Sequence, residues 1–290
     1  MPSKQENDVI NESVITLNIA YNPPLDWDGC LAYYEKHKIG DLESFVNNTY
    51  TRTFVFNNKI GVICICNNDK ENHLEIRIKT EDSNSVDFVL ERIKKMFDLL
   101  LDPVHVSKAF QAIPSLRRIQ FIKGTRLVGC WDNFELAVTA ILGQLVSIKQ
   151  ATGLVSQLLN LYGERKINSF TQREDILFPS PEILANESLS ELRIPQMKKK
   201  AIVALSKMVL DGQIDLYNGQ DPLVLKQKLM QIYGIGKWTA GYIALRAMGD
   251  ADAFPEGDVF LEKITSKKDI SALSPWRGYL ASYLYKYGVK

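Results

Sequence analysis

Asp258 is the carboxylate of this chain that is best placed to do chemistry. It follows Phe254-Pro-Glu-Gly257 and precedes a predicted helix over residues 260–264. An aspartate at such a position usually caps the helix by accepting its first backbone N–H groups. The functional alternative is an ionised carboxylate at the floor of a cleft, where it stabilises a cation forming at a sugar carbon and orients or deprotonates an attacking water. The two roles are compatible, because a capping bond itself keeps the carboxyl group ionised.

Three aromatic side chains could hold a planar ligand beside this carboxylate. Trp238 and Tyr242 share one helix face with Leu245, because they are spaced by four and seven residues. Most stripes of this kind are core packing. Trp238, however, lies in the first turn of its helix, where aromatic faces could stack a base and would favour an electron-poor one. Trp276 opens a later predicted helix and is a candidate third wall, with a capping or core role as the alternative.

The residues before Trp238 predict a turn that grips a phosphate. Gly234 and Gly236 allow a tight backbone reversal with exposed amides. A helix that begins near Lys237 points unpaired N–H groups and a partial positive charge at this turn. Residues 222–248 are therefore expected to form two helices joined by Gly-Ile-Gly, a hairpin that binds a nucleic-acid backbone.

The elements that position these residues fall into two parts. After a polar tail over residues 1–12, which is expected to be disordered, residues 13–104 predict a small α+β domain. Asn pairs punctuate its strands with residues that tolerate left-handed turns. Strands are expected at 14–21, 51–56, 60–66 and 73–79, with turns at Asn57-Asn58 and Asn67-Asn68, and helices at 28–38, capped by Asp26, and 85–101.

Strand signals stop after Pro103, and residues 105–290 are expected to be an all-helical region of two subdomains that form a cleft. Helices are expected at 133–162 (broken near 147–153), 181–185, 189–193, 196–210, 222–248 and 275–287, with a loop at 171–181. The predicted fold class is α+β: an N-terminal antiparallel sheet domain with helices on one side, followed by an all-helical bundle that carries the hairpin.

Composition narrows the class of protein. The chain has 290 residues, 46% of them hydrophobic and 24% charged, and no apolar run near the roughly 20 residues of a membrane span. The N-terminus lacks the apolar core of a signal peptide, which predicts a cytoplasmic protein. Four cysteines and three histidines are too scattered for an iron–sulfur cluster or another metal centre. A net charge of +1 is weak support for DNA binding by bulk electrostatics, although a hairpin that holds phosphates through amides needs fewer lysines.

The hairpin and the downstream Asp258 resemble the helix-hairpin-helix superfamily of DNA base-excision glycosylases. The closest likeness is to its alkylpurine branch, the AlkA-type 3-methyladenine DNA glycosylases II. The resemblance extends over nearly the whole chain in an ordered set of motifs: Tyr21-Asn-Pro-Pro-Leu-Asp-Trp27, Met96-Phe-Asp-Leu99, Arg126-Leu-Val-Gly-Cys130, Ala140-Ile-Leu-Gly-Gln-Leu-Val-Ser147, Leu161-Tyr-Gly-Glu164, Phe178-Pro-Ser-Pro181, Tyr233-Gly-Ile-Gly-Lys-Trp-Thr-Ala240 and Pro275-Trp-Arg-Gly-Tyr279.

The resemblance implies a role for each matching residue. Asp258 matches the catalytic aspartate, and Leu127 matches the apolar wedge that fills the gap left by a flipped nucleotide, with a packed loop leucine as the alternative. The implied base pocket consists of Trp238, Tyr242 and Trp276, and the implied phosphate site of Gly234, Gly236, Lys237 and Thr239. The carbonyls of Met230, Ile232 and Gly234 match a monovalent-cation site, so a structural Na⁺ or K⁺ is expected at the hairpin and no other cofactor.

The resemblance also implies a mechanism without strand cleavage. Relatives that cut the strand carry a lysine where this chain has Trp238, and that lysine attacks the sugar. Lys237 lies one residue earlier and is rotated by about 100° around the helix, so it is expected to face away from the sugar. We therefore expect a monofunctional enzyme that uses water as its nucleophile.

The expected activity is excision of alkylated purines from duplex DNA by base flipping and Asp258-assisted hydrolysis, as a step of base excision repair. The expected partner is double-stranded DNA with a damaged base, bound by a monomer in the cytoplasm at the nucleoid. Two alternatives remain: a glycosylase for oxidised or deaminated bases, which needs hydrogen-bonding groups in its pocket, and a damage-binding module without catalysis. The segment between Asp258 and Trp276 is short for the family, which bears on whether Trp276 reaches the pocket.

Overall fold

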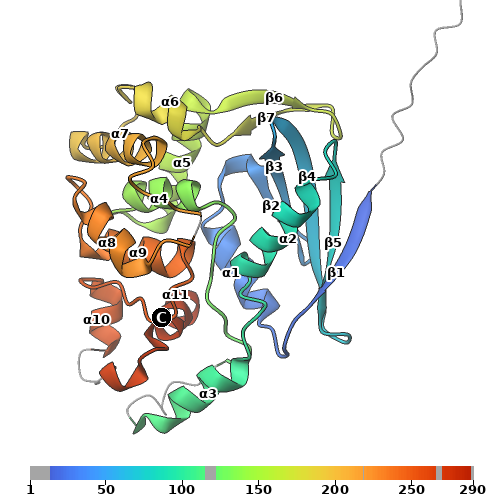
Figure 1. Ribbon diagram of the computed structural model, residues 1–290, viewed down its shortest axis with the longest axis vertical. Coiled ribbons are helices and arrows are strands. Elements are labelled where there is room, and N and C mark those ends of the chain that lie inside the picture. The colour runs from blue at the N-terminus through green and yellow to red at the C-terminus, as the bar shows by residue number, and fades with distance from the viewer. Residues whose placement is uncertain (1–13, 115–121, 218, 266–269, 289–290) are drawn as a thin grey trace, which may run out of the picture.

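A five-stranded antiparallel sheet forms the first part of the molecule. The computed structural model describes residues 14–114, 122–217, 219–265 and 270–288, so the expected tail over 1–12 lies outside the described residues (Figure 1). The strands run in the order β1-β5-β4-β3-β2. Their bounds are β1 (Ile15–Ala20), β2 (Glu43–Val46), β3 (Thr49–Phe56), β4 (Lys59–Asn68) and β5 (His73–Thr80). Four of these strands were predicted, and β2 was not, because its four residues are too short for an alternating pattern.

Asparagine pairs make the tight turns of this sheet. Asn57 and Asn58 both have positive φ, as the predicted two-residue turn between β3 and β4 requires, and Asn47 and Asn48 do the same between β2 and β3. The turn expected at 67–68 is wrong: β4 continues through Asn68, and the reversal comes at 69–72.

Two helices cover one face of the sheet, α1 (Trp27–Lys36) and α2 (Ser85–Met96) (Figure 1). Asp26 caps α1 by accepting the N–H of Gly29 at 3.2 Å, as predicted. The inward side chains of both helices and of β3–β5 make one apolar core, to which Val128 and Trp131 from beyond the sheet also belong. The helices therefore lie on one side of the sheet, as the sequence predicts.

The second part is mainly helical. Its helices are α3 (Pro103–Ala112), α4 (Asn133–Leu142), α5 (Ile148–Tyr162), α6 (Pro181–Asn186), α7 (Gln196–Leu210), α8 (Pro222–Met230), α9 (Lys237–Ala247), α10 (Val259–Thr265) and α11 (Arg277–Tyr287). The long predicted helix breaks at residues 143–147, slightly before the expected point, and the helix expected at 189–193 is a set of turns. Among the described helices, none is long and apolar enough to cross a membrane.

A β-hairpin corrects the all-helical expectation for the second part. β6 (Glu164–Asn168) and β7 (Arg173–Leu177) pair as a two-stranded antiparallel sheet, partly in the segment expected to be a loop. Their sequences, ERKIN and REDIL, are too charged to show an apolar alternation. The hairpin extends toward the large sheet, where Asp175 accepts the hydroxyl of Thr53 at 2.9 Å (Figure 1).

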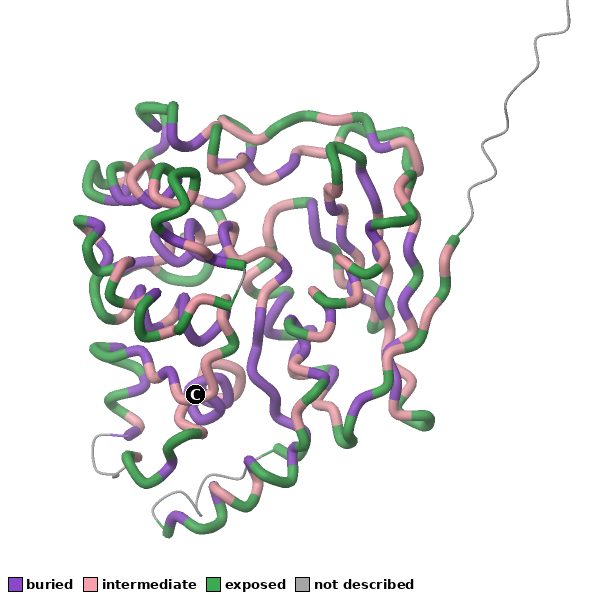
Figure 2. The backbone as a smooth tube through the Cα atoms, viewed as in Figure 1, coloured by how far each residue is buried: buried purple, intermediate pink, exposed green. Residues whose placement is uncertain are grey.

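A buried strand-like segment joins the two parts. Residues 124–129 are buried throughout and run between the sheet domain and the helices (Figure 2). The guanidinium of Arg126 within it donates to the backbone carbonyls of Asn22, Asp98 and Leu101. At the other end of the chain, Lys286 on α11 pairs with Asp26 at 2.9 Å. The interface is therefore a packed part of the fold, and side chains from both parts can line one site.

Candidate active site

Asp258 caps α10 and lies where α9, α10 and α11 meet. Its Oδ1 accepts the backbone N–H groups of Phe260 and Leu261, each at 3.0 Å. Its Oδ2 accepts the indole N–H of Trp238 and the hydroxyl of Tyr285, each at 2.7 Å. Four donors thus surround the carboxylate, which is 9% exposed, and an ionised carboxylate accepts such bonds with both oxygens.

Aromatic rings form a wall beside this carboxylate. Trp238 and Tyr242 lie one turn apart on α9 and stack, with ring centroids 5.5 Å apart and an interplanar angle of 16°. Tyr285 from α11 meets Tyr242 edge to face at 5.8 Å. The hydroxyls of Tyr33 and Tyr242 lie 3.1 Å apart. The wall therefore combines stacked faces with hydroxyl groups from both parts of the molecule.

This wall is one side of a cavity of about 480 Å³ between the sheet domain and the helices. Its lining includes Asp258, Trp238, Tyr242 and Tyr285. Such a volume is typical of a pocket for a small organic group. The further lining includes Tyr33, His37, Glu43, Arg52, Glu135, Thr139, Gly143, Val146, Ile148 and Arg246.

Arg246 places a buried positive charge behind the aromatic wall. It is 7% exposed and donates to the carbonyls of Val128 and Gly129 at 2.9 and 2.8 Å. Its third nitrogen, Nη1, donates to the hydroxyl of Tyr242 at 2.8 Å, and its guanidinium lies over the ring of Tyr33 at 5.0 Å. The arginine therefore contacts both tyrosines and fixes their positions in the wall.

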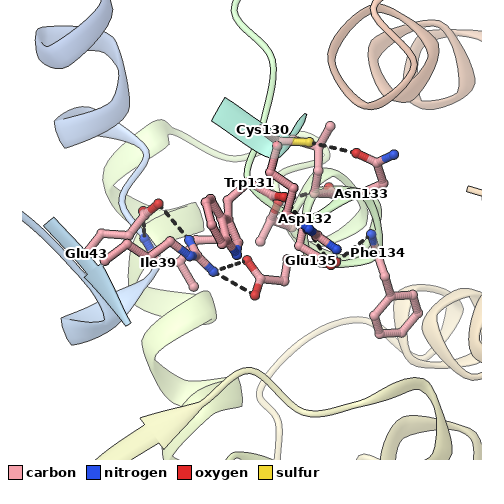
Figure 3. A network of polar contacts seen from close by, with 12 residues as sticks. Ile39, Glu43, Cys130, Trp131, Asp132, Asn133, Phe134 and Glu135 are labelled. Carbon is pink, nitrogen blue, oxygen red and sulfur yellow. Dashed lines mark hydrogen bonds and ion pairs between the residues drawn. The ribbon is translucent and has the colours of Figure 1, made fainter. Parts of the chain in front are cut away.

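Two glutamates and an arginine also line the cavity. Arg52 on β3 binds Glu43 at 2.7 Å and Glu135 on α4 through both carboxylate oxygens at 2.7 and 2.6 Å (dashed lines in Figure 3, where both glutamates are labelled). One guanidinium cannot neutralise two carboxylates. Burial and the nearby carboxylates of Asp132 and Glu43 raise the pKa of Glu135 to about 7, although Arg52 opposes the shift.

The predicted hairpin is present between α8 and α9. Gly234 has a φ of +99°, a value that side chains rarely adopt, and its missing Cβ leaves room for Met197. Gly236 has an ordinary extended conformation with open space around it, so its role is exposure of the backbone and not a positive φ. The chain therefore bends at Gly234 and presents the N-terminus of α9 to solvent.

Comparisons with known proteins cover most of the chain. A family model described as the AlkA N-terminal domain matches residues 16–132. The DNA-3-methyladenine glycosylase 2 of Escherichia coli (strain K12) is 29% identical over 93% of this chain and 96% of its own length. A 3-methyladenine DNA-glycosylase from Archaeoglobus fulgidus has a similar structure, with a TM-score of 0.75 at 16% identity over 94% of this chain and 98% of its own. A structure of MBOgg1 in complex with a low-affinity DNA ligand gives a TM-score of 0.70 at 20% identity over 95% of each chain.

Residues 16–132 therefore match an AlkA N-terminal domain, and the chain as a whole is similar to the AlkA-type helix-hairpin-helix glycosylases. The matched domain, residues 16–132, ends one residue after Trp131, which still packs in the apolar core of the sheet domain. The two solved structures align with nearly the whole chain, so they share its overall fold. The resemblance and the α+β fold class that the sequence predicted are therefore confirmed.

Two of the three expected pocket residues lie in the cavity and the third does not. Trp238 and Tyr242 line it, but Trp276 is absent from its lining. Trp276 instead packs against Tyr279, with ring centroids 5.6 Å apart, in the core around α11. Tyr285 takes its place as a wall. The two lie nine residues apart, which turns a helix by two and a half turns and puts them on opposite sides.

The residue expected to act as the wedge, Leu127, is buried and does not lie on the surface. Leu127 is 4% exposed and packs in the core with α11, so it cannot enter DNA. Leu145 is fully exposed in the turn between α4 and α5, and its φ of +56° holds it in the left-handed region. Its neighbours Gly143 and Val146 line the cavity. A weak signal for this residue exists in the sequence: an apolar side chain at a break between two helices, shortly after Gly143.

The remaining expected site residues lie around the hairpin. Lys237 is exposed and pairs with Glu256 at 3.2 Å, and Thr239 is buried one turn into α9. The carbonyls of Ile232 and Gly234 accept the N–H of Ile235 and the side-chain amide of Gln144, at 3.0 and 2.9 Å. Met230, the third expected cation ligand, ends α8. In the described ranges, no group of three or more His, Cys, Asp or Glu side chains could hold a metal ion.

Proposed function

We propose that this chain is a monofunctional DNA glycosylase that excises alkylated purines from duplex DNA, as a step of base excision repair. One observation carries the proposal: a carboxylate held by four donors lines an aromatic-walled cavity, one helix away from the hairpin at Gly234. The name of the Escherichia coli relative, DNA-3-methyladenine glycosylase 2, supports the substrate class.

In the proposed reaction, the aromatic wall would bind the base and the carboxylate would act on the sugar. A flipped purine would stack against Trp238 and Tyr242, and alkylation makes that purine cationic, which strengthens its attraction to the aromatic faces. Asp258 would stabilise the positive charge that grows on the sugar as the glycosidic bond breaks. Flipping costs a few kcal/mol and costs least at a damaged base.

The surface around the cavity would hold the DNA. We propose that Leu145 fills the gap left by the flipped nucleotide, because it is exposed beside the cavity, a use known for apolar side chains in DNA-bending proteins. The amides of Gly234, Gly236 and Thr239 and the side chain of Lys237 would meet a phosphate at the start of α9. The backbone carbonyls of Met230, Ile232 and Gly234 suit a bound Na⁺ or K⁺, since each oxygen has two lone pairs, and that ion would add positive charge beside the phosphate.

We propose further that water, and not an amine, attacks the sugar. Trp238 occupies the position next to Asp258, and its indole nitrogen is committed to that carboxylate. The ammonium of Lys237 pairs with Glu256 on the surface. Without an amine nucleophile no Schiff base forms, so borohydride should trap no covalent complex between the protein and abasic DNA.

The test uses duplex DNA treated with dimethyl sulfate. Chromatography of the released material should show free methylpurines, and strand breaks should appear only after heating in alkali. Asp258→Asn should release no base while binding DNA with an abasic-site analogue as tightly as the wild-type protein. Binding without release by the wild-type protein would instead support a damage-binding module, and strand breaks without alkali would show lyase activity.

Polar groups in the cavity favour a second substrate class, oxidised or deaminated bases. The hydroxyls of Tyr33 and Tyr242, together with Arg246, supply hydrogen-bond donors that a neutral base with exposed acceptors could use. Release of hypoxanthine from a duplex that contains it, measured beside methylpurine release, would rank the two classes. We propose that the chain acts on either as a monomer at the nucleoid, since its substrate is chromosomal DNA.

A further inference from the structure

Tyr285 is the one side-chain hydroxyl bonded to Asp258 among the described residues. It lies on α11 and donates to Oδ2 at 2.7 Å, the same oxygen that accepts the indole N–H of Trp238 at 2.7 Å. The bond links the last helix of the chain to the start of α10. Neither its sequence position nor the family motifs quoted above pointed to Tyr285.

The bonds to Asp258 use up its acceptor capacity. A carboxylate offers about four lone-pair sites. Two of them accept the amides of Phe260 and Leu261 at Oδ1, and the indole and phenol take the two at Oδ2. The carboxylate is thus oriented on both oxygens, and a water molecule can bind it only by displacing one of these donors.

The surroundings of Tyr285 keep it a donor. Burial and the adjacent carboxylate of Asp258 raise the pKa of Tyr285 far above its usual range, so the hydroxyl stays protonated at every working pH. The other ionisable groups facing this corner are the phenols of Tyr33 and Tyr242 and the guanidinium of Arg246, which donates to Tyr242. None of these three is bonded to Asp258.

We propose that Tyr285 is a positioning residue, which together with Trp238 holds Asp258 as an oriented anion, so that Asp258 acts in excision as a fixed negative charge and not as the base that takes a proton from water. The inference rests on the proposed function and deepens it. A charge that is already oriented needs no reorganisation when the sugar becomes cationic, which is the condition under which electrostatic stabilisation is most effective.

The test is Tyr285→Phe, which removes one oxygen and keeps the ring in the wall. Hydrogen bonds to charged groups are strong, so loss of this one is expected to slow single-turnover release of methylpurine by about ten- to a hundredfold. The Kd for DNA with an abasic-site analogue should stay within about twofold of wild type. The acid limb of the rate–pH profile should move to higher pH by about one unit, because an anion with one donor fewer is protonated more easily.

Tyr287→Phe is the matched control. Tyr287 lies two residues further along α11 and donates its hydroxyl to a carboxylate too, that of Asp26, but does not line the cavity. A merely structural role of such phenol–carboxylate bonds would change both variants alike. We expect Tyr287→Phe to lower the melting temperature and to leave the rate–pH profile of excision in place.

The outcomes separate the two proposals. If the wild-type protein releases no methylpurine, the proposed function fails and this inference with it. If the wild type is active and Tyr285→Phe matches it in rate and acid limb, this inference alone is overturned. If Tyr285→Phe does not fold, Trp238→Phe removes the other donor to Oδ2 and must displace the acid limb in the same direction; an unmoved limb there overturns the inference as well.

Discussion

The side-chain amide of Gln144 donates to the hydroxyl of Thr239 at 2.8 Å and to the carbonyl of Gly234 at 2.9 Å. Gln144 immediately precedes Leu145, and its two acceptors belong to the hairpin. On the other side, the buried ammonium of Lys198 donates to the carbonyls of Leu142 and Gln144 at 2.9 and 2.7 Å. Hydrogen bonds therefore connect the turn that carries Leu145 to the hairpin that would hold the phosphate.

Breaking this link should weaken DNA binding more than it slows base release. Gln144→Met keeps the length of the side chain but leaves the Gly234 carbonyl and the Thr239 hydroxyl unpaired in a buried site, at a cost of about 1–3 kcal/mol. We expect a Kd for abasic-analogue DNA about tenfold higher, measured by fluorescence anisotropy. Gln157→Met on the outer part of α5 is the control, and an equal effect of both changes would disprove the link.

Leu145 and Leu127 make a matched pair of leucines with opposite predicted effects. Leu145→Ala should lower base release from duplex DNA by tenfold or more and leave the melting temperature unchanged, because the side chain is fully exposed. Leu127→Ala should destabilise the fold by about 2–5 kcal/mol, as buried leucines do, and leave release per folded molecule intact. Denaturant melts and excision assays on both variants check this, and the reverse pattern would restore Leu127 as the wedge.

Substitutions of Tyr242 and Trp276 should likewise distinguish a residue that lines the pocket from one that packs in the core. Tyr242→Leu removes the ring that stacks on Trp238 and the acceptor of Arg246, so we expect excision to fall by at least tenfold. Trp276→Leu should lower stability through lost packing with Tyr279 and leave the steady-state KM and kcat of the folded enzyme near wild type. Loss of excision in Trp276→Leu at a temperature where it is folded would return this residue to the pocket.

His37 should make the protein sensitive to acid. Burial lowers the pKa of His37 to about 4 from 6.5 in the unfolded chain, so below pH 6.5 the unfolded chain binds more protons. Stability from this group is fully present above pH 6.5 and is lost as the pH falls toward 4, by at most about 1.4 kcal/mol per pH unit. His37→Asn keeps a donor for the Tyr33 carbonyl, which the Nδ1 of His37 contacts at 2.8 Å. Urea melts from pH 4 to 7 should show this loss in wild type relative to the variant.

Glu135 gives the opposite slope over nearly the same range and serves as the control. Its pKa is raised to about 7 from 4.5, so the folded protein binds the extra proton and gains stability as the pH falls from 7 to 4.5. Glu135→Gln should remove that gain and expose the loss due to His37. Parallel pH slopes in wild type and Glu135→Gln would contradict the assignment.

The sequence predicts those elements whose periodicity is undisturbed. The boundaries of α7 and the paired helices around Gly234 follow from local patterns, and Asp258 as a helix cap follows from its residue type. The residues that were misplaced, Trp276 and Leu127, depend on which side of an element faces the cavity. That choice is made by tertiary packing, since Tyr285 and Trp276 are both aromatic residues of the same C-terminal segment and only contact with α9 and α10 separates them.

The left-handed backbone at Leu145 has a consequence for how quickly the enzyme engages DNA. A leucine with a φ of +56° stores about 1–2 kcal/mol of strain, which the Gln144 and Lys198 bonds around it offset. Because the turn already has this strained conformation without DNA, it would not have to change conformation when it contacts a duplex. With Leu145 as the proposed wedge, a glycosylase would test each base pair with a rigid side chain during a brief encounter, and a β-branched residue at this position would slow that step.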